Sequence, residues 1–112
     1  MPLLSEVLER ARTHVAGGWH EPMSLDASGV ICAPNDEGIS RFCVSDALHV
    51  AAGGRSADID AQVDAELELA AQLRHAGERR SLSTWLEDKH TLHGDVLRLM
   101  HTAAQHLRAE GR

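Results

Sequence analysis

Aromatic side chains are nearly absent from this chain, and their scarcity limits the folds open to it. The 112 residues include two tryptophans, one phenylalanine and no tyrosine. A hydrophobic core must therefore be built from Leu, Val, Ala and Ile, and such a core suits closely packed helices. A chain of this length forms one core as a rule. The sequence thus predicts a single globular domain over residues 1–112 that is mainly helical.

Apolar residues at three- and four-residue spacing indicate where the helices lie. They predict helices over residues 3–16 and 39–52, a third from the N-cap Ser56 to Gly77, a short one over 81–88, and a final helix capped by Thr91. The third helix has the clearest predicted core stripe, made of Ile59, Val63, Leu67, Ala70 and Leu73.

The segment WHEPMSLDASGVICAP, residues 19–34, has the pattern of two short strands joined by a turn. Trp19, Met23 and Leu25 share one alternating face, and DASG supplies the turn. Two strands alone are marginal in water, so this hairpin must pack on helices. The predicted fold is a compact bundle of four to five helices with one short β-hairpin between the first and second helices.

The charge of the chain limits its partners. The formal net charge is -6 and the pI is about 5.7, which argues against a nucleic-acid-binding surface. No apolar run is long enough to span a membrane, and Glu6 and Glu9 interrupt the stretch where a signal peptide would be apolar. We therefore expect a cytoplasmic protein with no nucleic-acid or membrane partner, in which Cys32 and Cys43 are reduced and buried.

Four histidines near the C-terminus raise the question of a metal site, since imidazole is a common metal ligand. Two histidines on one helix need four-residue spacing to share an ion, and no such pair occurs among His90, His93, His101 and His106. The remaining metal candidate is His90 and His93 with the acid Glu87 or Asp88. The alternative is that these histidines are solvated or cap helix ends.

Other groups of reactive side chains fit catalysis poorly. Ser45, Asp46 and His49 share a helix stripe, but one straight helix face cannot supply the geometry of a catalytic triad with an oxyanion hole. Neither Cys32 nor Cys43 lies in an activating motif. The sequence therefore predicts no catalytic residue and no cofactor.

An acidic series runs along the third predicted helix without an intervening base. It comprises Asp58, Asp60, Asp64, Glu66 and Glu68. A solvated helix face accounts for such a series, and a docking surface for a basic partner is the alternative. Asp58, Asp64 and Glu68 are the candidate interaction residues.

Three segments together resemble a known family. AGGWHE ends the first helix, FCVSDALHVAAG covers the second, and STWLEDKHTLHGDVLRLMHTA lies near the C-terminus. They are similar to a small bacterial and phage family of unknown function with a Gly-Trp pair, a Cys-Leu-Leu-Gly-Ala-Leu helix and a Trp-Asn-Asp segment followed by Thr. Asp46 replaces the glycine of that pattern, and Leu86 and Glu87 replace its Asn-Asp. The resemblance, carried by Gly18, Trp19, Cys43, Ala47, Leu48, Trp85 and Thr91, implies a shared architecture.

Three functions follow as hypotheses. The first is a non-catalytic interaction or regulatory module that binds another protein or itself as a homodimer. The second is a small metal-binding protein or enzyme that uses His90 and His93. The third is an acidic inhibitor of a defence system, carried by a phage or mobile element.

Trp85 is the residue that we expect to anchor the junction between the short helix and the rest of the bundle. A tryptophan followed by Leu86 can bury a large apolar area, and we expect it to pack against the first or second helix. Trp85→Ala should then lower the free energy of unfolding by about 3 to 5 kcal/mol, measured by denaturant titration.

Overall fold

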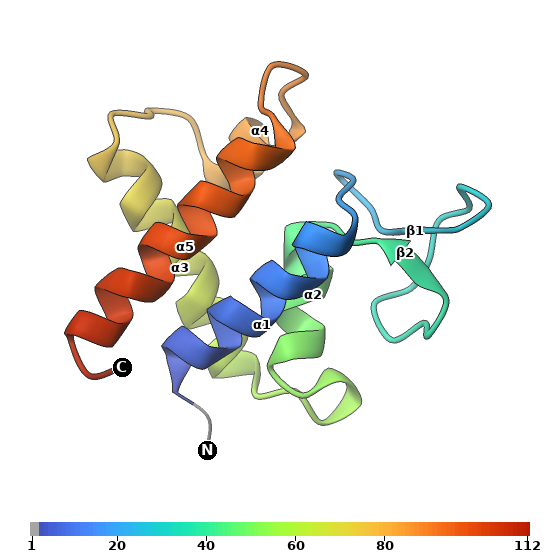
Figure 1. The fold of residues 1–112 in the computed structure, drawn as a ribbon, viewed down its shortest axis with the longest axis horizontal. Helices are drawn as coiled ribbons and strands as arrows, with labels where there is room; N and C mark the ends of the chain where they lie inside the picture. Colours follow the sequence, from blue (N-terminus) through green and yellow to red (C-terminus); the bar gives the residue numbers. More distant parts are fainter. Residues whose placement is uncertain (1–2) are drawn as a thin grey trace.

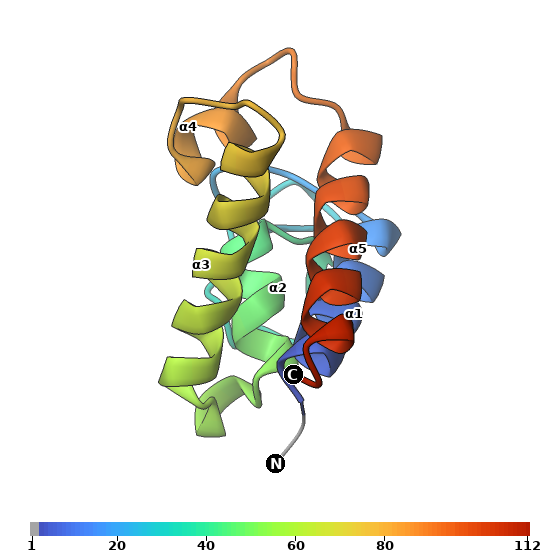
Figure 2. The ribbon, with the colours of Figure 1, turned by 90° about the vertical axis from the view of Figure 1, so that its left-hand side faces the viewer.

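The four longer helices form two layers, an arrangement that can be followed in Figures 1 and 2. α1 (Leu4–Gly17) and α5 (His93–Ala109) lie side by side in one layer, and α2 (Val44–Ala51) and α3 (Ile59–His75) form the other. The structure is a computed structural model that describes residues 3–112. The predicted helical bundle with a hairpin between its first two helices is confirmed.

Two short elements complete the bundle. A 3-10 turn, η1 (Gly54–Ser56), joins α2 to α3, and α4 (Leu82–Glu87) rests against α3. Arg112 lies against the first turn of α1, where the backbone N–H of Ser5 donates to its carbonyl oxygen at 3.3 Å. None of the helices in residues 3–112 is long and apolar enough to cross a membrane.

The hairpin pairs β1 (Leu25–Asp26) with β2 (Ile39–Arg41) in antiparallel register. Its second strand therefore lies after the segment 19–34 that was predicted to hold both strands, where Leu25 makes only an isolated bridge to Ile31. The predicted turn is present, since the N–H of Gly29, at φ +83°, donates to the carbonyl of Asp26 at 3.0 Å. The predicted helix over 39–52 was wrong in its first turns: residues 39–42 are extended and α2 begins at Val44. Pairing with Gly18 accounts for this, because the N–H of Phe42 donates to the Gly18 carbonyl at 2.8 Å.

Two predicted helix caps also differ from the structure. Asp58, not Ser56, caps α3, and its carboxylate accepts the N–H of Ala61 at 3.1 Å. Thr91 precedes the cap position of α5 and instead donates its hydroxyl to the carbonyl of Trp85 at 2.6 Å. Thr91 therefore fixes the connection between α4 and α5.

The core lies between the two layers, and α3 turns a different face toward it than the sequence pattern predicted. Leu73 is buried as expected, but Ile59, Val63 and Leu67 are 60%, 46% and 61% exposed. The buried face of α3 consists of Ala65, Leu69 and Leu73. At 100° per residue the centres of the two apolar stripes are about 120° apart. This helix has two apolar stripes that could face the core, and the stripe that contains the small Ala65 is the one that does.

Trp85 is less buried than the sequence suggested. Its ring packs against the core but stays partly exposed, whereas Leu86 is 7% exposed. Its helix, α4, makes its main helix–helix contact with α3. We therefore expect Trp85→Ala to cost less than the range for a fully buried tryptophan.

The assignment of the buried face of α3 can be tested with two leucines. Leu69→Ala should lower the free energy of unfolding by about 2 to 5 kcal/mol, because it leaves a cavity in the core. Leu67→Ala makes the same chemical change two residues away on the exposed face and should cost about 1 kcal/mol or less. Urea titration of the two variants measures the difference, and equal costs would contradict the observed rotation of α3.

Candidate functional site

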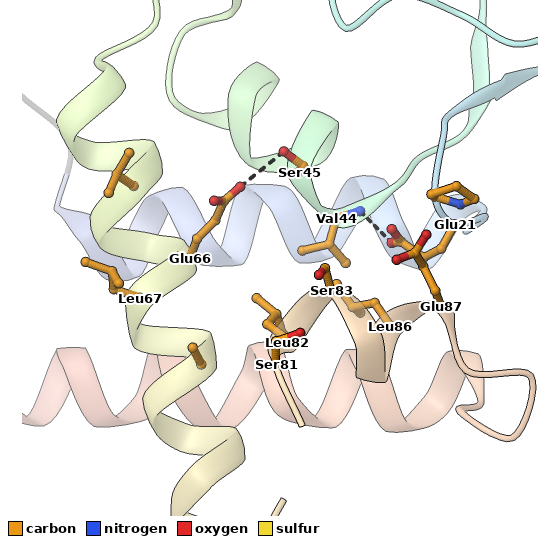
Figure 3. A pocket seen from close by; sticks show the side chains of 13 residues that line it. Glu21, Val44, Ser45, Glu66, Leu67, Ser81, Leu82, Ser83, Leu86 and Glu87 are labelled. Carbon is orange, nitrogen blue, oxygen red and sulfur yellow. Dashed lines mark hydrogen bonds between the residues drawn. The ribbon is translucent and has the colours of Figure 1, made fainter. Parts of the chain in front are cut away.

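A groove of about 470 Å³ opens between the N-terminal end of α2, one face of α3 and the start of α4. Its walls are mainly apolar, and Figure 3 shows the side chains that line it. The apolar lining consists of Pro22, Val44, Val63, Leu67, Ala70, Leu82 and Leu86. Two of these residues, Val63 and Leu67, belong to the exposed stripe of α3, so the groove and the stripe form one continuous apolar surface.

Three carboxylates border this groove. Glu66 projects from α3 and accepts the hydroxyl of Ser45 at 3.1 Å. Glu21 and Glu87 lie together on the other side, as Figure 3 shows. The lining residues include no lysine or arginine, and these three carboxylates form no ion pair with any residue in 3–112. The groove is therefore apolar in its walls and negative at its edges.

Glu21 connects the groove to the start of α2. One carboxylate oxygen, Oε2, accepts both the indole N–H of Trp19 and the backbone N–H of Val44, each at 2.8 Å. It therefore serves as a partner for an otherwise free N–H in the first turn of α2. Burial raises the pKa of Glu21 above its usual value, and the nearby charge of Glu87 adds to the increase.

Buried polar groups fix the first turn of α2 and leave no activated nucleophile there. The hydroxyl of Ser24 donates to the Asp46 carboxylate at 2.7 Å and accepts the backbone N–H of Cys43 at 3.0 Å. Burial raises the pKa of the Cys43 thiol to about 11, so it is protonated at neutral pH. Cys32 and Cys43 are both free and buried.

The serine, aspartate and histidine that share a stripe on α2 face separate partners. Ser45 donates to Glu66, and Asp46 accepts from Ser24. The ring nitrogens of His49 lie 3.2 Å from Gln62 Oε1 and 3.0 Å from Asn35 Oδ1. Within residues 3–112, no serine hydroxyl is held against the His49 ring, as nucleophilic catalysis would require.

The candidate metal ligands are not brought together. His93 Nε2 lies 2.6 Å from the carbonyl oxygen of Val15, and the His93 ring stacks on Trp19 with 5.8 Å between centroids. His90 is exposed, and Glu87 borders the groove. Within residues 3–112 no three His, Cys, Asp or Glu side chains are grouped so that they could hold a metal ion. His93 instead joins the start of α5 to the end of α1.

The three candidate interaction residues of α3 have different surroundings. Asp58 is the cap of the helix, as described above. Glu68 turns toward α5, where its carboxylate lies 2.6 Å from His106 Nδ1. Asp64 is exposed. Of the three, only Asp64 lies fully on the surface with no hydrogen bond or ion pair to residues 3–112.

Sequence reasoning missed both the groove and two of its carboxylates as site residues. Glu66 appeared only as one member of an acidic series, and Glu21 lies in a loop without a recognisable motif. A signal for the groove was present in α3, since Ala65, Leu69 and Leu73 form a second apolar stripe at four-residue spacing. When a helix has two apolar stripes and one packs into the core, the other stays exposed on the surface.

Residues 1–106 match the family described as "Family of unknown function (DUF6197)". The chain belongs to this family. No curated protein and no solved structure gives a significant match.

The residues that suggested a family resemblance have structural roles in this member of DUF6197. A Cβ atom on Gly18 would lie 2.4 Å from the carbonyl oxygen of Ser40, so only glycine allows this approach of α1 to β2. The Cys43 sulfur accepts the N–H of Asp46 at 3.4 Å and caps α2. Thr91 bonds the backbone at Trp85. Such roles maintain the fold, and none of these three residues lines the groove.

The raised pKa of Glu21 predicts a particular dependence of stability on pH. The folded state holds the Glu21 proton more tightly than the unfolded chain does. Its contribution to the free energy of unfolding is therefore full below about pH 4.5 and declines as the pH rises through the folded-state pKa. Glu21→Gln should remove this decline, so the stability of the parent relative to the variant should fall between pH 4.5 and neutrality. Urea titrations of both proteins at a series of pH values measure this difference in the free energy of unfolding. A difference that stays constant or rises with pH would contradict the raised pKa of Glu21.

Proposed function

We propose that this protein is a non-catalytic interaction module, and that another protein docks along the groove between α2, α3 and α4. The observation that carries this proposal is the exposed apolar stripe of Ile59, Val63 and Leu67, which runs into the groove. A contiguous apolar patch with polar edges is typical of a protein–protein interaction site.

The absence of an assembled catalytic group among residues 3–112 supports a binding role. His49 contacts two amide oxygens, the Cys43 thiol is protonated, and His93 bonds a backbone carbonyl. The metal-binding alternative has no cluster of ligands in the same residues to support it. Two free, buried thiols fit a reducing compartment, so we propose that the module acts in the cytoplasm. The net charge of -6 favours a protein partner over a nucleic acid.

Site-specific photocrosslinking in native cells tests this proposal. A photoreactive amino acid at Leu67 should yield a defined adduct with one protein, identified by mass spectrometry, because this side chain lies at the mouth of the groove. The matched control places the same amino acid at Thr102, an exposed residue of α5 in the other layer. Adding Val63→Glu to the protein that carries the photoreactive group at position 67 should reduce the adduct at least severalfold.

Two results would overturn the proposal. One is a lack of any adduct from position 67. The other is an adduct pattern that is the same from positions 67 and 102, which would mean that capture reflects chance encounter and not docking in the groove.

A further inference from the structure

The charges around the groove indicate the chemistry of its partner. Some carboxylates elsewhere on the surface pair with arginines, as Glu9 does with Arg108 and Asp95 with Arg98. Glu21, Glu66 and Glu87 have no such basic partner in residues 3–112. Glu21 is also partly buried, and its Oε1 atom accepts no hydrogen bond from these residues although Oε2 accepts two. A positive group in the groove would supply the missing counter-charge.

The exposed stripe of α3 indicates the length and shape of the partner. Ile59, Val63 and Leu67 recur every fourth residue over about 12 Å of the helix axis. Glu66 borders one edge of this stripe, and the exposed Asp60 and Asp64 border the other. An apolar track with acidic edges is complementary to a helix that has an apolar face flanked by Lys or Arg.

Other occupants fit these observations less well. A second copy packed through α3 would bring the acidic edges of two stripes together, and like charges in contact are unfavourable. A phosphate-bearing surface would be repelled in the same way. A small organic cation would fill the groove of about 470 Å³ but leave Ile59 uncovered, because Ile59 does not line the groove.

We infer that the groove and the α3 stripe bind a basic amphipathic helix of a partner protein, whose apolar face covers Val63 and Leu67 and whose Lys or Arg side chains meet Glu66 and the Glu21–Glu87 pair. This inference rests on the proposed docking function and specifies its ligand. Burial raises the pKa of Glu21, which agrees with a carboxylate that lacks a nearby positive charge. Association should be faster and tighter at low salt, as for other electrostatically complementary pairs.

A displayed library of helical peptides tests the inference without knowledge of the natural partner. The library fixes leucine at the i, i+3, i+4 and i+7 positions and randomises the remainder with Lys, Arg, Glu, Gln and Ala. Selection on the full-length protein should enrich peptides of positive net charge. A parallel selection on Val63→Glu/Leu67→Glu, whose substitutions lie on the exposed face of α3, should show no enrichment.

Two double variants determine whether the carboxylates of the groove account for the binding of basic peptides. Glu66→Gln/Glu87→Gln should weaken binding of the best selected peptide about three- to tenfold in a fluorescence anisotropy titration. Glu6→Gln/Glu37→Gln removes the same charge from exposed residues outside the groove and should leave the affinity within about twofold. The loss of affinity caused by Glu66→Gln/Glu87→Gln should become smaller as the salt concentration is raised.

Several results would overturn the inference. One is enrichment of peptides without positive net charge, and another is enrichment no greater than in the selection on Val63→Glu/Leu67→Glu. A third is that the two charge variants change the peptide affinity equally. A fourth is a concentration-dependent dimer of the protein that Leu67→Glu abolishes. If crosslinking from Leu67 identifies a partner while the library shows no charge preference, the docking function stands and the basic-helix inference fails. If both experiments fail, the docking function falls as well.

Discussion

Close contact between helices through alanine is the constraint on which the rest of this structure depends. With three aromatic residues in the chain, the layers meet through small side chains on each of the four main helices. The buried alanines are Ala11, Ala47, Ala51, Ala65, Ala103 and Ala104. Alanine allows helix axes to approach closely and costs no side-chain entropy when buried. For α3, this contact requires Ala65 to face inward, and the larger Ile59, Val63 and Leu67 are turned outward as a consequence.

The sequence predicted the positions of the helices better than it predicted which face of each helix is buried. The bounds of α1 and α4 were correct within a residue or two, because spacing and end signals such as Gly17-Gly18 and Ser81 are local. Residues 39–42 were assigned to a helix because their apolar pattern fits either conformation. Pairing with the distant β1 and with the Gly18 carbonyl decides between the two. The buried face of α3 likewise depends on its neighbours, since two stripes with similar periodicity were available.

The second apolar stripe of α3 was a signal for an exposed apolar face, but the position of the groove could not have been predicted from it. The groove combines segments that are distant in the chain. Glu21 comes from the loop after α1, Glu66 from α3 and Glu87 from the end of α4. In the sequence, Glu21 and Glu66 look like ordinary surface acids, and Glu87 was considered only as a metal ligand. The histidines, in contrast, were conspicuous in the sequence, yet His93 and His106 serve to join helices through Val15 and Glu68.

The position of Glu21 links occupancy of the groove to the stability of α2. Its Oε2 atom already accepts the N–H of Val44 at the start of that helix, and a charged carboxylate is a stronger acceptor than a protonated one. A basic side chain bound beside Glu21 and Glu87 would lower the raised pKa of Glu21 and so favour its ionised form. The same cation would thereby strengthen the bond that holds the first turn of α2. Because such coupling is reciprocal, a change that stabilises ionised Glu21 would also favour binding of the cation that we propose for the groove.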